Sequence, residues 1–92
     1  MRYEFKTSFD RSVKGLSDGA KIEIKKSVFE IIDLISAGKI ASKGQGLTRL
    51  HMDYWEARTT IRERILFKLT DDLIQFMIIG NHEDIKRFLK RI

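Results

Sequence analysis

A tight turn between two apolar segments is the feature that most constrains the fold of this chain. Thr70-Asp71-Asp72 separates a run at 64–69 from a run at 73–79, and both are rich in Ile, Leu and Phe. Apolar runs joined by a short polar turn are typical of an antiparallel β-hairpin. The second run is apolar at nearly every position, which indicates a strand in the interior of a sheet or covered on both sides.

The segments around this hairpin predict further strands and three helices. Short strand patterns lie at 47–51 and 54–59, and the polar–apolar alternation of residues 3–7 indicates a half-exposed first strand. The expected helices are a short one capped by Ser8, a long one from Ser17 or Asp18 to about Ala37, and a final one capped by Asn81. Helical spacing assigns these apolar residues to the core: Ile24, Val28, Ile31, Ile32 and Ile35 on the long helix, and Ile85, Phe88, Leu89 and Ile92 on the last.

The order strand, two helices, three or four strands, helix predicts the α+β class. We expect a small, mostly antiparallel sheet with an N-terminal helical hairpin and a C-terminal helix, and with the helices packed on one face. The chain of 92 residues has room for one modest core, so we expect a single domain over 1–92.

Composition narrows the possible functions. Eighteen Lys and Arg against 13 Asp and Glu give a net charge of +5, which suits a polyanionic partner such as nucleic acid. The absence of cysteine excludes disulfides, thiolate metal sites and cysteine nucleophiles, and with only two histidines we expect no metal site and no cofactor. No segment approaches the roughly 18 apolar residues of a membrane span, and the first residues lack a signal-peptide core, so we expect a cytoplasmic protein.

The residue types that remain suit RNA cleavage without a metal. Attack of an RNA 2′-hydroxyl on the neighbouring phosphate needs a base, an acid for the leaving oxygen, and cations that stabilise the added negative charge. His82 and His51 can exchange protons near neutrality, and arginine binds phosphate oxygens in a bidentate way. The candidate cations are Arg58, Arg62 and Arg64.

The same residues also have a purely structural interpretation. Glu56 or Glu63 could pair with the arginines across the sheet, and the two histidines could lie at element ends without any role. The glycines of segment 39–46 are not followed by the Gly-Lys-Ser/Thr of a phosphate-binding loop, so we expect a surface loop there. Residues alone therefore leave both interpretations open.

Four segments carry a resemblance to a known family. The strands Tyr54-Trp55-Glu56-Ala57-Arg58 and Arg64-Ile65-Leu66-Phe67-Lys68-Leu69, the turn Thr70-Asp71-Asp72 and the sequence Gly80-Asn81-His82 together resemble the RelE/ParE superfamily. These proteins are the toxins of type II toxin–antitoxin pairs. The similarity covers nearly the whole chain and is greatest to the YoeB- and RelE-like mRNA interferases.

The resemblance implies a ribosome-dependent, metal-free endoribonuclease that cleaves mRNA. Arg64 stands where the family has its phosphate-stabilising arginine and His82 where it has its general acid, with Arg58 and His51 as further candidate catalytic residues. Gln45 stands where the YoeB-like proteins place a glutamate base, which leaves the base open among His51, Glu63 and a lysine. The candidate RNA-binding residues are Lys43, Arg49, Arg62, Lys86, Lys90 and Arg91.

Partners follow from the same resemblance. It implies an acidic antitoxin that masks the basic surface by docking on the exposed flank of the long helix and on the sheet edge. It also implies binding of operator DNA only through the toxin–antitoxin complex. The alternative function is that of a ParE-like toxin, which inhibits DNA gyrase without nuclease activity.

The pairing of the predicted hairpin makes a geometric prediction about the site. With a strict two-residue turn, Thr70 pairs with Leu73 and Arg64 lies opposite Ile79. By alternation, His82 would then project on the sheet face opposite to Arg64. Arg64 and His82 can form one site only if the strand ends at Gly80, so that the alternation of side chains no longer applies to His82.

Overall fold

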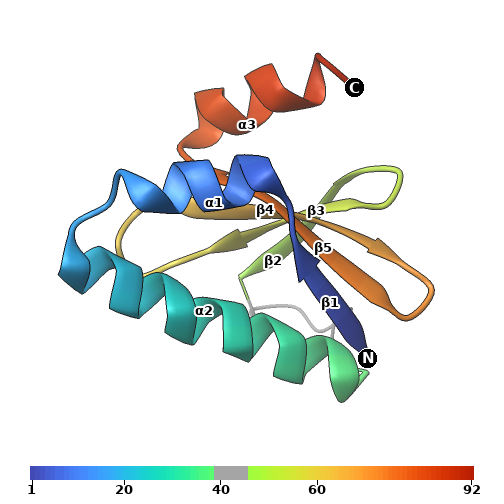
Figure 1. The fold of residues 1–92 in the computed structure, drawn as a ribbon. Helices are drawn as coiled ribbons and strands as arrows, with labels where there is room; N and C mark the ends of the chain where they lie inside the picture. Colours follow the sequence, from blue (N-terminus) through green and yellow to red (C-terminus); the bar gives the residue numbers. More distant parts are fainter. Residues whose placement is uncertain (39–45) are drawn as a thin grey trace.

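The computed structural model describes residues 1–38 and 46–92, which form an α+β fold with five strands and three helices (Figure 1). The strand order is β1-β5-β4-β3-β2. β1 runs parallel to β5, whereas the other neighbouring strands are antiparallel, so the sheet is mixed. The elements are β1 (Arg2–Phe5), α1 (Thr7–Lys14), α2 (Asp18–Ser36), β2 (Leu47–His51), β3 (Tyr54–Arg58), β4 (Arg64–Thr70), β5 (Leu73–Gly80) and α3 (His82–Leu89).

Local signals locate α2 and α3 correctly. The Ser17 side chain accepts a hydrogen bond from the Ala20 amide at the start of α2, and Gly38, with a φ of 71°, follows the end of the helix. Asn81 caps α3 through a capping box, in which Asn81 and Asp84 each bind the other's backbone amide. None of the helices in these two stretches is long and apolar enough to cross a membrane.

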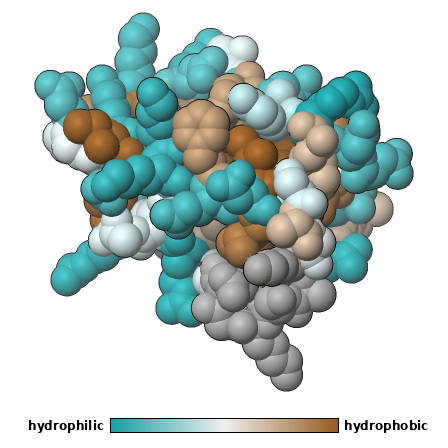
Figure 2. Space-filling model, turned by 90° about the horizontal axis from the view of Figure 1, so that it is seen from below, coloured by the Kyte–Doolittle hydropathy of each residue, from teal (hydrophilic) through white to brown (hydrophobic). Residues whose placement is uncertain are grey.

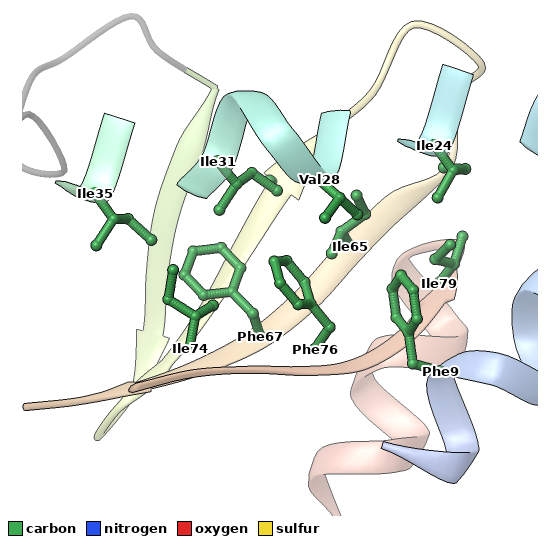
Figure 3. Close-up of a cluster of buried hydrophobic side chains, with 11 residues drawn as sticks. Phe9, Ile24, Val28, Ile31, Ile35, Ile65, Phe67, Ile74, Phe76 and Ile79 are labelled. Atoms are coloured by element: carbon green, nitrogen blue, oxygen red, sulfur yellow. The ribbon is translucent and has the colours of Figure 1, made fainter. Parts of the chain in front are cut away.

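The main core lies between α2 and one face of the sheet (Figure 3). Phe67 of β4 and Phe76 of β5 are fully buried, and their ring centroids lie 6.2 Å apart. α1 adds Phe9, whose ring lies 5.6 Å from that of Phe76. The helix α2 supplies its predicted apolar side chains to this core: Ile24, Val28, Ile31 and Ile35 are buried, and Ile32 is partly buried.

The third helix lies on the other side of the sheet, contrary to the expectation that all helices share one face. Figures 1 and 3 place α3 across β5 from α2. Leu66 and Ile85 are both buried yet belong to no part of the main core. Leu66 alternates with Ile65 and Phe67, so its side chain points to the face opposite α2. Both faces of the sheet are therefore covered near the middle of β4.

A β-bulge changes the pairing that the turn predicts. Thr70 pairs with Leu73 as expected, and the register is regular as far as Phe67 opposite Phe76. Leu66 then pairs with Ile78, so Met77 is an extra residue in β5. As a result Arg64 lies opposite Gly80, and the predicted pairing with Ile79 is wrong by one residue.

Helix α1 holds this bulge from the edge of β5. β1 pairs with β5 only as far as Phe76, and α1 continues along the strand from there. The Ser8 hydroxyl donates a hydrogen bond of 2.5 Å to the Met77 carbonyl, and the Ser12 hydroxyl accepts one of 3.0 Å from the Ile79 amide. Ser8 is therefore not the cap of α1 that the sequence predicts; Lys6 occupies the N-cap position without a side-chain bond.

Gly80 ends β5, as the sequence predicts, and it also makes room for the next helix. Its φ is not in the left-handed region. A β-carbon at this position would lie 2.6 Å from the β-carbon of Asp84, the residue that closes the capping box of α3. Glycine at position 80 therefore permits α3 to begin close to the sheet, with His82 as the first residue of the helix.

Candidate functional site

Two arginines meet at the ends of β3 and β4. Arg58 is the last residue of β3, Arg64 is the first residue of β4, and the two are directly paired across the strands. Directly paired residues project on the same face of a sheet. Glu56 lies two residues before Arg58 and shares this orientation, opposite to that of Trp55 and Ala57, which belong to or pack against the core. We call the sheet face that carries Glu56, Arg58 and Arg64 the arginine face.

Glu56 forms an ion pair with Arg64. The Arg64 Nη1 atom donates a hydrogen bond to Glu56 Oε1. The Glu56 side chain is 6% exposed and that of Arg64 is 36% exposed, so the carboxylate is buried beneath a guanidinium that still reaches solvent. Among the charged residues that the structure describes, only Glu56 is buried. A carboxylate at this depth requires a charged partner, and Arg64 provides it.

Arg58 completes an excess of positive charge. Arg58 is exposed and forms no ion pair within residues 1–38 and 46–92. Like charges directly opposite each other on two strands destabilise a sheet. One carboxylate offsets one of the two guanidinium groups, which leaves a net positive charge. An anionic ligand such as a phosphate would relieve the repulsion, and arginine binds phosphate in a bidentate way.

His82 begins the element that follows the strand opposite Arg64. Gly80 is the partner of Arg64, and His82 comes two residues later as the exposed first residue of α3. The bulge at Met77 thus replaces the regular pairing that the turn predicts, and β5 ends at Gly80, so strand alternation does not extend to His82 in α3.

The turn between β3 and β4 adds a third cation. Thr59 closes this turn, since its amide and its hydroxyl both donate hydrogen bonds to the Glu63 carbonyl. Arg62 lies within the turn, is exposed, and has a φ of 68°, a conformation that is uncommon for residues other than glycine. It is two residues from Arg64 and lies at the same end of the sheet.

Two predicted residues lie elsewhere. His51 pairs with Tyr54, so four residues of β3 separate its position from Arg58, a distance of about 13 Å along the strand. Arg49 pairs with Trp55, its guanidinium carbon lies 5.9 Å from the Trp55 ring, and its Nε donates to the Met52 carbonyl. Trp55 belongs to the α2 side, so Arg49 projects away from the arginine face, whereas His51 shares the face of its partner Tyr54 but lies at the far end of that face from Arg58.

The remaining predicted cations lie at the C-terminal end. Lys86 is an exposed residue of α3, Lys90 is its C-cap, and Arg91 follows. All three are exposed on α3 or just after its end. Lys43 and Gln45, the predicted RNA contact and the residue at the position of the family's base, lie outside the described residues. Among the described residues, no three His, Asp or Glu side chains lie together as ligands for a metal ion.

The ion pair of Glu56 with Arg64 is the feature of this face that was not predicted from the sequence. The sequence indicates Glu56 only as one of two possible structural partners for the arginines. The available signal was the alternation of β3, where Glu56 and Arg58 share a face opposite the apolar Trp55 and Ala57. Burial of the carboxylate could not be read from that pattern, because it depends on how Arg64 covers it.

A second surface feature is an apolar groove between α1, α2 and β1, with a volume of about 820 Å³. Its lining includes Phe9, Ile24, Val28 and the half-exposed Phe5 and Phe29. Seen from the side on which α2 lies, the surface shows hydrophobic areas between hydrophilic ones (Figure 2). Four cations also line the groove, against one acidic residue, Asp10: Arg11, Lys14, Lys21 and Lys25.

The clearest effects on ionisation occur at the β1 edge, away from the arginine face. Arg2 forms an ion pair of 2.9 Å with Asp72 in the hairpin turn, and this hydrogen bond lowers the pKa of Asp72. Glu4 accepts hydrogen bonds from Gln75 and Lys6, which lower the pKa of Glu4. Both interactions attach the first strand to the hairpin while the carboxylates are ionised.

Comparison with known proteins identifies the fold. No protein-family model and no curated protein matches the chain. Among solved structures it is similar to the E. coli RelBE toxin–antitoxin complex, with 12% identity and a TM-score of 0.63 over 87% of this chain and 94% of the other. It is similar to the YoeB–YefM toxin–antitoxin complex of Staphylococcus aureus, with 14% identity and a TM-score of 0.66 over 89% and 97%. The E. coli DinJ–YafQ complex matches at 19% identity and a TM-score of 0.65 over 91% and 97%.

The chain therefore has the α+β fold that these solved structures share. The structural neighbours of the chain are RelE, YafQ and YoeB, toxins of the RelE/YoeB toxin–antitoxin superfamily, and the resemblance seen in the sequence is confirmed at the level of the fold. At these identities the likeness concerns the fold, so the activity has to be argued from the residues of the site.

Proposed function

We propose that this protein is the toxin of a type II toxin–antitoxin pair and cleaves mRNA on the ribosome without a metal ion. The observation that carries the proposal is the pair of arginines on one sheet face, with His82 at the start of the next element, in a RelE-like fold. RelE and YoeB toxins among the similar structures support this function over a ParE-like gyrase inhibitor.

The proposed chemistry assigns one task to each group. Arg64 and Arg58 bind the scissile phosphate and stabilise the charge of the pentacoordinate transition state. His82 donates a proton to the leaving 5′-oxygen, a task for which imidazole is the most common side chain in enzymes. The products are a 2′,3′-cyclic phosphate and a 5′-hydroxyl.

The basic surface of α3 guides the RNA backbone in this proposal. Lys86, Lys90 and Arg91 are exposed on or beside the helix that His82 begins, and Arg62 lies at the same end of the sheet as Arg64. Contacts of this kind release counterions, so RNA binding should weaken steeply as salt rises. Each lysine removed should reduce the slope of the logarithm of the binding constant against the logarithm of the salt concentration by about one.

The cognate partner in this proposal is an acidic antitoxin that docks in the groove between α1, α2 and β1. The groove offers apolar side chains for the hydrophobic side of a helix, and its four cations suit acidic residues on the helix flanks. β1 lies at the edge of the sheet beside the groove, which allows a partner strand to pair there as well. Binding of operator DNA would require this complex.

Docking can be tested with a synthetic amphipathic helix that carries leucines on one side and glutamates on its flanks. We expect it to bind the wild-type protein and to bind the double variant Lys21→Glu, Lys25→Glu at least tenfold more weakly. Lys90→Glu on the opposite side of the sheet is the control and should leave binding nearly unchanged. Equal affinity of a version with lysine flanks would contradict a groove selective for acidic helices.

The activity itself can be tested by the chemistry of the cleaved ends. Ribosomes programmed with a defined mRNA are incubated with the protein, and the 3′ ends of the fragments are analysed by mass spectrometry. The proposal expects cleavage within codons in the ribosomal A site and 2′,3′-cyclic phosphate ends. Intact mRNA, or growth arrest without mRNA cleavage, would favour the gyrase-type alternative.

A further inference from the structure

The proposed reaction needs a proton acceptor, and the described structure narrows the choice. His51 lies about 13 Å along β3 from Arg58, too far to reach a phosphate held by the two arginines. Glu63 lies in the β3–β4 turn, where its carbonyl is bound by Thr59. Among the described residues, neither side chain forms a hydrogen bond or an ion pair with the Arg64 guanidinium, whereas that of Glu56 does.

Glu56 has the location and the contacts of an active-site carboxylate. It lies on the arginine face, two residues from Arg58 on the same strand and in an ion pair with Arg64 on the next. Its neighbour on β2 is Thr48, which is uncharged, and α3 begins with His82. The charged side chains that share its face at this end of β3 and β4 are thus Arg58 and Arg64, while Asp84 of α3 packs against Gly80, the strand partner of Arg64.

Only one of the two carboxylate oxygens is engaged. Arg64 binds Oε1, and no residue in the described stretches donates a hydrogen bond to Oε2. In these stretches every side-chain oxygen that is closed off from solvent has a hydrogen-bond partner. The unbonded Oε2 is therefore not closed off from solvent. Oε2 is therefore the atom through which Glu56 can accept a hydrogen bond from a ligand hydroxyl.

We propose that Glu56 is the general base of this protein and accepts the proton of the attacking 2′-hydroxyl. This inference rests on the proposed nuclease function and assigns the one role that the sequence left open. Glu56 also orients Arg64 through Oε1, so that base and phosphate-binding group are held at a fixed separation.

The reaction step balances with the residues of the site alone. The proton of the 2′-hydroxyl passes to Glu56 Oε2 while the 2′-oxygen forms a bond to phosphorus. The bond between phosphorus and the 5′-oxygen breaks, and protonated His82 gives its proton to that oxygen. Glu56 ends protonated and His82 neutral, and exchange with water restores both. No metal ion, oxidant or further reactant takes part.

The test measures single-turnover cleavage of mRNA on programmed ribosomes as a function of pH for the wild type, Glu56→Gln, Glu56→Asp and Glu63→Gln. Glutamine keeps the volume of Glu56 and the oxygen that Arg64 binds, but it cannot accept the proton. We expect Glu56→Gln to lower the rate constant by at least about 100-fold and to abolish the rise of rate with pH on the acidic side. Glu56→Asp should keep that rise, and Glu63→Gln should stay within about threefold of the wild type.

The outcomes separate this inference from the proposed function. A Glu56→Gln variant that is folded and cleaves at the wild-type rate, or that is slow but keeps the acidic limb of the profile, contradicts the base role while the nuclease stands. A wild-type protein that cleaves no mRNA contradicts both. If Glu56→Gln does not fold, Glu56→Asp decides, because the shorter side chain withdraws the accepting oxygen and should lower the rate constant at least about tenfold; a folded Glu56→Asp variant with the wild-type rate contradicts the base role.

Discussion

The bulge in β5 offers a quantitative test of how the site is built. The Ser12 hydroxyl accepts a hydrogen bond from the Ile79 amide and donates one to the Phe9 carbonyl. Ile79 is buried, so the substitution Ser12→Ala leaves its amide without this partner beneath α1. We expect the loss of this bond to destabilise the fold and to loosen the register that places Gly80 opposite Arg64.

The size of the effect follows from two opposing contributions. An unsatisfied buried amide costs about 1–3 kcal/mol, and alanine in place of serine in a helix returns about 0.5 kcal/mol. The net loss is therefore about 0.5–2.5 kcal/mol, which corresponds to a decrease in melting temperature of about 2–20 °C for a domain of this size.

The assay is urea denaturation followed by circular dichroism, together with amide hydrogen exchange. Ser36→Ala, at the exposed end of α2, is the matched control and should change the free energy of unfolding by less than about 0.5 kcal/mol. Exchange at the Ile79 amide should accelerate in Ser12→Ala but not in the control. Equal stability of the two variants, with Ile79 still protected, would refute the idea that α1 holds the bulge.

Other predictions concern the core, the last helix and the β1 edge. Phe67→Ala should lower the free energy of unfolding by about 3–5 kcal/mol in urea denaturation, because Phe67 is fully buried between the sheet and α2. Asn81→Ala should cost about 0.5–2 kcal/mol and reduce helical circular dichroism through loss of the capping box. The pKa of Asp72 is lowered by Arg2, so this ion pair stabilises the fold above the ordinary Asp pKa, and the contribution is lost as pH falls through the lowered value. An NMR titration should show the Asp72 pKa rising toward its ordinary value in the variant Arg2→Ala, and an unchanged pKa would contradict this.

Elements that depend on local signals could be predicted from the sequence. The apolar spacing of α2, the Asn81 cap and the pairing of Thr70 with Leu73 each involve residues close together in the chain, and all three occur in the structure. The parallel pairing of β1 with β5 joins residues about 70 positions apart and carries no local pattern. This parallel pairing makes the sheet mixed, and it could not be predicted from the sequence.

The geometry of the site depended on such distant contacts. The turn alone predicts a regular hairpin, in which Arg64 and His82 project to opposite faces. The bulge that shifts this pairing by one residue is bound by Ser8 and Ser12, residues of α1 that periodicity assigns only to a helix. Burial of Glu56 likewise follows from the packing of Arg64 above it and not from any motif.

The measurement that tests the central claim most directly is primer extension on an mRNA translated in a reconstituted system, with wild type, Arg64→Ala and His82→Ala. Arg11→Ala, on the groove side of α1, is the control for loss of a positive charge. The account predicts A-site cleavage by the wild type and the control, and a decrease of at least about 100-fold in both site variants. Intact mRNA with the wild-type protein, or undiminished cleavage by Arg64→Ala, would contradict the account.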